Sequence, residues 1–371
     1  MGDESAHQVA DLYATYTIEG AGLGLNVSRW LQADPAHTID RLLDSVGARQ
    51  EQLWNDYGLR RTACLISCSP EDAEVERVAH RLAFEPQLRH INFSILVTDA
   101  FMSKLVEIDI KRDPATMSVV EAIWKTGLPC ISFIDSINMA DPLDRRLNCS
   151  NPCGEQYLPA GEGCNLGSLN LASFITTTGI NERGLKAAVR YMARLLDRVI
   201  DVTSYPSAEH RDRAEDVRRI GMGVMGFGSA LSRAGIAYGS TESLELLDTA
   251  LHLIRATARA ELGDRPYLTS IAPTGGISLA LAVSPGIEPD YTMPNRIPGW
   301  KEQVQVLATA QEHVDNAVSK TVLLPTSATH DDVRGAMISA WETRCKGISI
   351  FRVDSRLSRD VDKVSGCGKV A

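Results

Sequence analysis

Hydrophobic residues along the chain follow two kinds of pattern, one helical and one typical of buried strands. Over residues 38–57 apolar side chains recur at helical spacing, as at Ile39, Leu42, Leu43 and Val46. The segment 92–97 is instead apolar at nearly every position, which suits a strand buried on both faces. Helices are predicted over 3–17, 38–57, 71–84, 117–125, 183–202, 211–233, 242–262, 300–317 and 329–344, and strands over 92–97, 131–134, 321–324 and 347–352, with a loop over 60–67 that enters a further short strand.

The alternation of strands and helices predicts the fold class. Strands separated by helices at this spacing pair in parallel, so we expect an α/β sheet or barrel. No internal repeat or low-complexity linker interrupts the pattern. We divide the chain into a short N-terminal helix with a glycine loop over 1–30, an α/β body over 31–357 and a polar, flexible tail over 358–371.

Composition narrows the class of protein. The chain has 371 residues, of which 44% are apolar and 23% charged, as in soluble globular proteins. Its opening, MGDESAHQVADLY, carries no export signal, and no later run approaches the roughly 20 apolar residues of a membrane span. A formal charge of −9 without a basic block argues against nonspecific nucleic-acid binding. We therefore expect a cytoplasmic protein that binds neither nucleic acid nor membrane.

Eight cysteines are the first chemical clue. In a cytoplasmic chain of this size they are too few and too irregularly spaced for a disulfide scaffold. They are therefore either buried small hydrophobic residues or thiols used in chemistry. No metal-ligating set is predicted from the sequence.

The densest polar segment is residues 148–171, NCSNPCGEQYLPAGEGCNLGSLNL. Asn151, Cys153 and Glu155 alternate in it with a proline and a glycine, so in an extended loop all three side chains would point the same way. An amide, a thiol and a carboxylate on one face suit a nucleophile or hydrogen-atom carrier beside a base and an orienting group. Cys164 is close enough to return to the same pocket. An ordinary turn with two buried thiols explains the spacing equally well.

The order of residues in this segment resembles a known family. The run 151–156, NPCGEQ, followed by 164–171, CNLGSLNL, resembles the finger-loop signature of class II ribonucleotide reductases. The resemblance implies a ten-stranded α/β barrel whose central loop carries Cys153 at its tip. It also implies that a thiyl radical on Cys153 abstracts the 3′ hydrogen of the ribose.

The other finger-loop roles come from the same resemblance. Glu155 would be the base for the 3′ hydroxyl, Asn151 would hydrogen-bond the substrate, and Cys164 would be one of the redox thiols. Further blocks resemble the family in the same order, so that the similarity runs from about residue 10 to 357: residues 92–102, 195–206, 218–227, 315–321 and 345–348.

The segment Thr274-Gly275-Gly276-Ile277-Ser278 is a candidate phosphate loop. Its amides and hydroxyls could hold phosphate at a helix start, although a polar glycine turn is more often just a turn. In its position it resembles the substrate phosphate loop of the family, which assigns Thr274, Gly275, Gly276 and Ser278 to that role. Gly275-Gly276 replaces the usual Gly-Thr of the family.

The class assignment rests on an absent residue pair. Class I enzymes relay the radical through two adjacent tyrosines near the last barrel strand, where this chain has GISIFR over 347–352. The resemblance is therefore to enzymes that generate the radical locally with adenosylcobalamin, where the cofactor supplies the hard chemistry. It implies a ribonucleoside di- or triphosphate as substrate and a thiol reductant such as thioredoxin.

The chain also departs from the family pattern. The family's first redox cysteine lies upstream of the segment that matches residues 20–24, and we expect this chain to start too late to include it. Two alternatives are open: a second polypeptide or a second copy supplies that part, or Cys64 or Cys68 substitutes for the missing thiol. For both cysteines, burial in a strand is the simpler interpretation. In the tail, where the family usually has a cysteine pair, only Cys367 is present.

Other functions stay open at this stage. The same radical could end in dehydration or epimerisation of a nucleotide without net reduction. A catalytically silent barrel that binds nucleotide or completes a partner is a further alternative, although it would have no need of Asn151, Cys153 and Glu155 together. A thiol hydrolase would need a histidine placed as base, and none of the eight histidines is suggestively placed.

Overall fold

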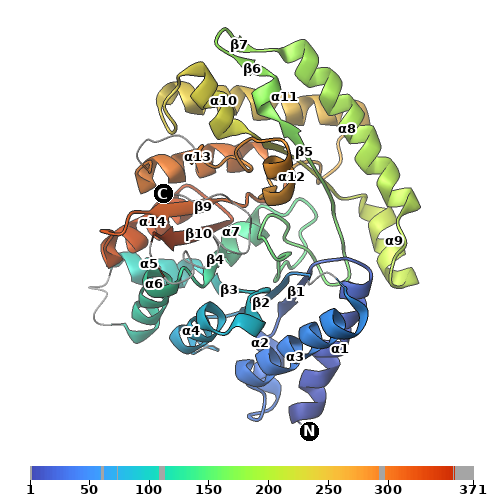
Figure 1. Cartoon of the computed structure of the whole chain (residues 1–371), viewed down its shortest axis with the longest axis vertical. Coiled ribbons are helices and arrows are strands. Elements are labelled where there is room, and N and C mark those ends of the chain that lie inside the picture. The colour runs from blue at the N-terminus through green and yellow to red at the C-terminus, as the bar shows by residue number, and fades with distance from the viewer. Residues whose placement is uncertain are drawn as a thin grey trace.

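The computed structural model of the chain describes residues 2–59, 62–72, 74–107, 113–291, 297–353 and 355, with backbone only for 2–4 (Figure 1). The strands are β1 (Leu23–Asn26), β2 (Cys64–Cys68), β3 (Ile91–Val97), β4 (Cys130–Phe133), β5 (Asn165–Asn170), β6 (Ile175–Thr176), β7 (Gly179–Ile180), β8 (Ile220–Met225), β9 (Thr321–Leu324) and β10 (Gly347–Arg352). The helices are α1 (Gly2–Ile18), α2 (Ser28–Ala33), α3 (Ile39–Tyr57), α4 (Val75–Phe84), α5 (Asp99–Glu107), α6 (Pro114–Thr126), α7 (Ile134–Met139), α8 (Glu182–Val202), α9 (Ala208–Val217), α10 (Phe227–Ala234), α11 (Thr241–Leu262), α12 (Gly275–Ala280), α13 (Trp300–His313) and α14 (His330–Glu342).

The strands form one curved wall with helices outside it (Figure 1). Strands β1 to β4 pair in parallel in chain order, and β10 joins β4 in antiparallel orientation and β9 in parallel. Strand β8 pairs in parallel with β5. Single bridges from Met222 to Thr269 and from Ile271 to Val318 connect β8, through the segment 269–271, to the chain that enters β9. The predicted α/β barrel with parallel pairing is therefore confirmed.

The antiparallel junction divides the wall into a first half, β1 to β4, and a second half, β5, β8, 269–271, β9 and β10. The carboxyl ends of one half therefore lie at the same end of the barrel as the amino ends of the other. Strands β2 and β8 are buried along their whole length, as expected where helices cover one face and the barrel interior the other. Strands β6 and β7 form a separate hairpin.

One predicted helix is wrong. The segment 211–233 was expected to be continuous, but α9 ends at Val217, β8 follows, and α10 begins at Phe227. Three glycines between 221 and 226 make this stretch a poor helix. At Gly223 a side chain would place its Cβ 2.1 Å from the Ser270 carbonyl oxygen, so the close approach of two wall segments requires glycine there.

The predicted division at residue 30 falls within α2 and separates β1 from the sheet to which it belongs. Residues 23–26, which it assigns to the N-terminal region, form β1 and pair with β2. The predicted helix over 300–317 is also shorter, because it ends at His313 before Val314 turns into extended backbone. The tail predicted over 358–371 lies outside the described residues. In the described part of the chain, no helix combines the length and apolar character needed to span a membrane.

Candidate active site

Residues 149–158, called the finger loop here, form a tight hairpin within the barrel, with residues 149–151 and 156–158 as its stem and Cys153 at its tip. Ser150 and Tyr157 form an antiparallel bridge, and the Asn151 N–H donates to the Gln156 carbonyl at 2.9 Å. The Gly154 N–H then donates to the Asn151 carbonyl at 3.1 Å, which closes a four-residue turn with Gly154 at a φ of +80°. The extended conformation predicted for 151–155 is therefore wrong, because a reverse turn brings these residues together instead.

Strands of the first half hold the loop on one side. The Asn26 amide on β1 donates to the Asn148 carbonyl at 2.6 Å, and the Asn92 amide on β3 donates to the Pro152 carbonyl at 2.8 Å. At Gly24 of β1 a Cβ would lie 1.8 Å from the Ser150 carbonyl oxygen. The loop can approach β1 this closely only because residue 24 has no side chain.

The second half holds the loop on the other side. The Gln156 amide donates to the Ser270 hydroxyl at 2.7 Å, and the Ala317 N–H donates to the Glu155 carbonyl at 3.0 Å. Hydrogen bonds from both halves therefore fix the loop in the centre of the barrel. This is the central position that the finger-loop resemblance implied.

Cys153 occupies the tip of the turn and is an exposed residue. The surrounding barrel nevertheless desolvates its thiolate and raises the pKa of Cys153 to about 12, with smaller contributions from Glu155 and Cys130. At neutral pH the group is therefore a neutral thiol. A neutral thiol is a poor nucleophile, because the thiolate is the nucleophilic form, but it retains the S–H bond that hydrogen-atom chemistry requires.

Glu155 is the buried member of the site, with 1% of its surface exposed. Burial raises the pKa of this carboxyl above its usual value, and a hydrogen bond from the Asn151 amide opposes the rise. Its Oε2 atom is buried without a hydrogen-bond partner within the described residues. A buried carboxylate oxygen without a partner is costly in a folded protein, so this atom suits an acceptor for a ligand hydroxyl.

Cys164 comes directly before β5 and is half-buried. Its thiol donates weakly to the Asn165 carbonyl, with sulfur and oxygen 3.5 Å apart. Burial raises the pKa of Cys164 well above its ordinary value, the Arg219 cation opposes this, and Glu155 adds to it. The structure thus brings Cys164 within electrostatic range of the finger loop.

Sequence reasoning assigned no role to a buried charged cluster near Cys164, formed by Arg219 and Glu162. Two nitrogens of the Arg219 guanidinium donate to one Glu162 carboxylate oxygen at 2.9 and 3.0 Å, and a third donates to Asn316 at 2.6 Å. The guanidinium lies 3.4 Å from the centre of the Tyr267 ring. The RRIG motif at 218–221 was the available signal, but its partners come from distant segments.

Cys130 was also missed, because the predicted strand began at residue 131. It is the first residue of β4, and its sulfur accepts a hydrogen bond from the Ser349 hydroxyl at 3.1 Å. Its contribution to the raised pKa of Cys153 places it within electrostatic range of the finger-loop tip.

The two suggested substitute thiols lie elsewhere. Cys64 and Cys68 are fully buried on β2 and belong to the main apolar core, and burial raises the pKa of each to about 12. Ser67, on the opposite face of the same strand, contacts Cys149 of the finger-loop stem at 3.5 Å. Side-chain alternation therefore turns both thiols away from the loop. Cys367 lies outside the described residues.

The candidate phosphate loop follows the segment 269–271 and leads into α12. Thr274 has a φ of +56°, and its hydroxyl accepts a hydrogen bond from the Gly286 N–H at 2.8 Å. Open space surrounds Gly275 and Gly276. Ser278 is 2% exposed, and its hydroxyl donates to the Gly275 carbonyl at 3.2 Å. The Thr274 hydroxyl and the backbone of the two glycines are therefore the groups that a ligand could contact, while the Ser278 hydroxyl stabilises the turn.

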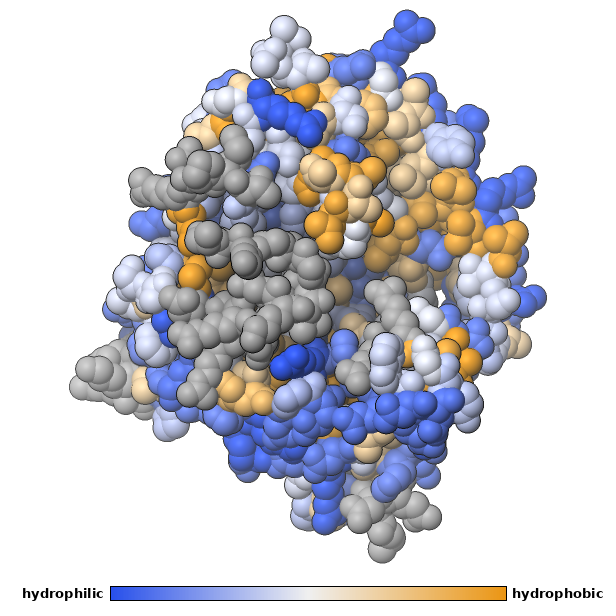
Figure 2. All heavy atoms as spheres, viewed as in Figure 1, coloured by the Kyte–Doolittle hydropathy of each residue, from blue (hydrophilic) through white to orange (hydrophobic). Residues whose placement is uncertain are grey.

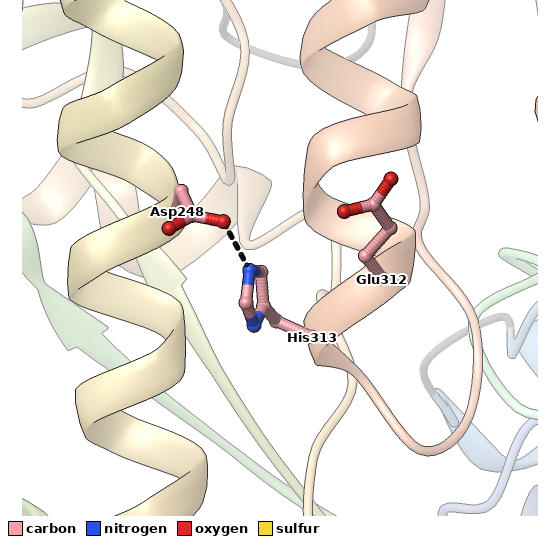
Figure 3. Close-up of side chains that lie close together, drawn as sticks. All are labelled: Asp248, Glu312 and His313. Carbon is pink, nitrogen blue, oxygen red and sulfur yellow. Dashed lines mark hydrogen bonds and ion pairs between the residues drawn. The ribbon is translucent and has the colours of Figure 1, made fainter.

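Among the described residues, Asp248, Glu312 and His313 form one group whose ligand atoms lie within 4.8 Å of one another (Figure 3). The His313 Nε2 lies 2.6 Å from Asp248, and the group bridges α11 and α13 in the outer helix layer. No finger-loop residue belongs to it.

Comparisons with known proteins were made for the whole sequence. The family model described as "Ribonucleotide reductase, barrel domain" matches residues 110–261 and 297–351, more than half of the chain. The α subunit of a class Id ribonucleotide reductase from Actinobacillus ureae superposes with a TM-score of 0.68 at 17% identity, covering 88% of this chain and 76% of that one. At that identity the superposition supports the fold alone.

Two sequence relatives are named "Vitamin B12-dependent ribonucleoside-diphosphate reductase". The protein from Mycobacterium tuberculosis is 30% identical, over 81% of this chain and 57% of its own length. The protein from Thermoplasma acidophilum is 27% identical, over 72% of this chain and 48% of its own length. The chain thus spans about half the length of these relatives.

Proposed function

This chain belongs to the ribonucleotide reductase barrel family, as the finger-loop motif predicted, and we propose that it reduces the 2′ position of ribonucleotides by radical chemistry started at Cys153. The observation that carries the proposal is the finger-loop tip. An exposed neutral thiol stands there beside a buried carboxylate that has one oxygen without a partner.

Cys153 is the proposed hydrogen-atom abstractor. As a thiyl radical it forms an S–H bond while the C3′–H bond of the ribose breaks, so the unpaired electron moves to C3′. The raised pKa supports this role, because the abstracted hydrogen then stays on a neutral thiol until it is returned to C3′. The turn from Asn151 to Gly154 places Cys153 at the tip of the loop.

Glu155 is the proposed base for the 3′ hydroxyl. Its Oε2 atom would accept the hydroxyl hydrogen bond, and its raised pKa brings it closer to the range in which a carboxylate takes up a proton. Asn151 is the proposed orienting group, because its amide lies close enough to the Glu155 carboxylate to lower the pKa of that group. Thr274, Gly275, Gly276 and Ser278 form the proposed phosphate loop for a ribonucleoside di- or triphosphate, with Ser278 supporting the turn.

Cys164 is the proposed redox thiol. Replacing the 2′ hydroxyl by hydrogen releases water and requires two electrons and two protons, which two thiols supply when they become a disulfide. Cys164 can provide one of them, and a thiol reductant such as thioredoxin is proposed to restore it. The described cysteines are all free thiols, which suits the reducing cytoplasm as the proposed location.

Adenosylcobalamin is the proposed cofactor. The relatives named above carry vitamin B12 dependence in their names, and β10 has no tyrosine that could relay a radical. When bound, the cofactor would supply the one-electron oxidation that turns the Cys153 thiol into a thiyl radical. A Cβ added at Gly154, Gly275 or Gly276 would meet no atom of the described residues within 4 Å, and α12 carries exposed apolar side chains that could contact a large group (Figure 2).

A second polypeptide, or a second copy of the chain, is proposed to complete the wall. Strands β1 and β5 lie at the two ends of the wall, and in the described residues each pairs with only one neighbour. Every residue of β1 is half-buried, and Leu166 of β5 is 40% exposed, whereas β2 and β8 are fully buried. Unpaired strand edges of this kind accept an additional strand.

A radical reaction without net reduction is the second candidate. Cys64 and Cys68, the thiols that could replace the family's first redox cysteine, face away from the finger loop. If neither they nor a partner chain supplies the second redox thiol, the C3′ radical would instead lead to dehydration or epimerisation of the nucleotide.

Product identification tests both candidates. The chain is incubated anaerobically with adenosylcobalamin, dithiothreitol and each ribonucleotide, and the products are identified by mass spectrometry. A 2′-deoxynucleotide supports reduction, while free base or a nucleotide isomer supports the second candidate. Either product must disappear in Cys153→Ser. Products that persist in that variant would remove Cys153 from the radical role.

A further inference from the structure

A cavity of about 630 Å³ opens at the end of the barrel opposite the candidate phosphate loop. Its lining includes Arg265, Val314 and Lys346, and each of them comes before a strand segment of the second half. The phosphate loop comes after such a segment, so it lies at the other end of the barrel. On the other side it is lined by Ala140 and Leu143, which follow α7. The volume lies within the range of cavities that bind small molecules.

The lining is rich in cations although the chain as a whole is acidic. Five basic side chains line the cavity against three acidic ones, so the lining carries a net charge of +2 in a chain of −9. The basic residues are Arg255, Arg259, Arg265, Arg344 and Lys346, and the acidic ones are Asp264, Glu312 and Asp315.

The buried carboxylate of Asp315, already counted among the acidic residues, is shared between several partners. Its Oδ2 atom accepts hydrogen bonds from two backbone N–H groups, of Leu268 and Thr269, and from the Thr269 hydroxyl. Its Oδ1 atom alone meets Arg255 at 3.0 Å and Arg259 at 3.2 Å. One carboxylate oxygen therefore serves two guanidinium groups, and Arg259 lies 3.7 Å from a second acidic residue of the lining.

Arg265 forms an ion pair with Asp197, a carboxylate outside the lining, whereas two other cations have weak or uncharged partners. The Lys346 ammonium donates to the carbonyls of Asp315 and Asn316 at 2.7 and 2.6 Å, which satisfies hydrogen bonds but not charge. Arg344 has its nearest carboxylate, Asp99, 4.0 Å away and is well exposed. The Arg259 Nε is buried without a hydrogen-bond partner in the described chain.

We propose that this cavity is a second anion site, which binds a small molecule carrying two or more phosphate groups. Guanidinium groups pair with phosphate oxygens through parallel hydrogen bonds, and several of them converge here from α11 and from the segment before β10. The site is separate from the substrate phosphate loop and does not depend on the reaction proposed above.

Calorimetric titration of the full chain with inorganic triphosphate, at constant ionic strength, tests the site. The variant Arg259→Gln/Arg344→Gln removes two cations while Arg255 continues to pair with Asp315. The matched control, Arg29→Gln/Arg183→Gln, removes two exposed cations elsewhere. We expect the cavity variant to weaken binding roughly tenfold or more and the control to leave it within about twofold of the unmodified chain.

A Thr274→Ala variant separates this site from the substrate loop, because triphosphate binding at the cavity must survive it. Equal affinity of the cavity variant and the control would overturn the proposal. It would also be overturned if an acidic peptide such as polyglutamate bound the cavity while triphosphate and ATP did not, since the surface would then be a docking site for a protein segment.

Discussion

At the scale of single residues, the candidate site depends on a tight turn and on anchors from both halves of the barrel. Asn151, Cys153, Glu155 and Cys164 were selected from the sequence because an amide, a thiol and a carboxylate at that spacing suit one chemistry. The turn that unites the first three depends on a backbone hydrogen bond to Gly154 and on anchors from both halves of the barrel. Those anchors come from distant segments, so local spacing could not reveal them.

The pKa of Cys153 gives a prediction at this scale. Desolvation raises this pKa to about 12, so most of the Cys153 thiol should stay protonated when the pH rises above 9. Only the thiolate reacts with iodoacetamide. At pH 8 we expect Cys153 to be alkylated roughly a thousandfold more slowly than a free cysteine, with a rate that increases about tenfold per pH unit up to pH 10.

Mass spectrometry of the peptide that contains residue 153 measures this rate, with glutathione in the same tube as the reference thiol. A rate that levels off near pH 9 would show an ordinary thiol and would contradict the desolvated environment described for the finger-loop tip.

At the scale of elements, hydrophobic periodicity located most helices and failed where glycine matters. The helices over 38–57 and 242–262 were predicted to within a residue or so, because each has a clear apolar face against the core. The pattern over 211–233 predicts one helix, yet this stretch contains β8. The glycines of β8 allow the segment 269–271 to approach it closely. Strand β5 was not predicted, since its mixed burial gives no clear period.

Strand β1 offers a prediction at this scale. Replacing Gly24 by Ala would place a Cβ 1.8 Å from the Ser150 carbonyl oxygen, so β1 or the finger-loop stem must move. We expect Gly24→Ala to lower the free energy of unfolding by about 1–3 kcal/mol, the usual cost of overpacking. Urea denaturation followed by circular dichroism measures the change.

The matched control is Gly163→Ala, because nothing lies within 4 Å of a Cβ there. If both variants unfolded at the same urea concentration as the unmodified chain, the close contact between β1 and the finger loop would be refuted.

At the scale of the whole molecule, the fold class and the family followed from the sequence, and the division into regions did not. Alternating strands and helices predicted a parallel α/β barrel, and the finger-loop motif predicted the family. The boundary at residue 30 separated β1 from a sheet to which it belongs, because a four-residue strand after a glycine loop has too little pattern to be recognised. The basic cavity escaped notice because its residues come from four distant segments.

The central claim for the molecule is that Cys153 removes the 3′ hydrogen of a ribonucleotide. The most direct measurement compares the consumption of a ribonucleotide with hydrogen or deuterium at C3′, in the presence of adenosylcobalamin and dithiothreitol. Our account predicts slower consumption of the deuterated nucleotide, no consumption by Cys153→Ser, and retained consumption by the control variant Cys345→Ser. Equal consumption of the two nucleotides, or turnover by Cys153→Ser, would contradict it.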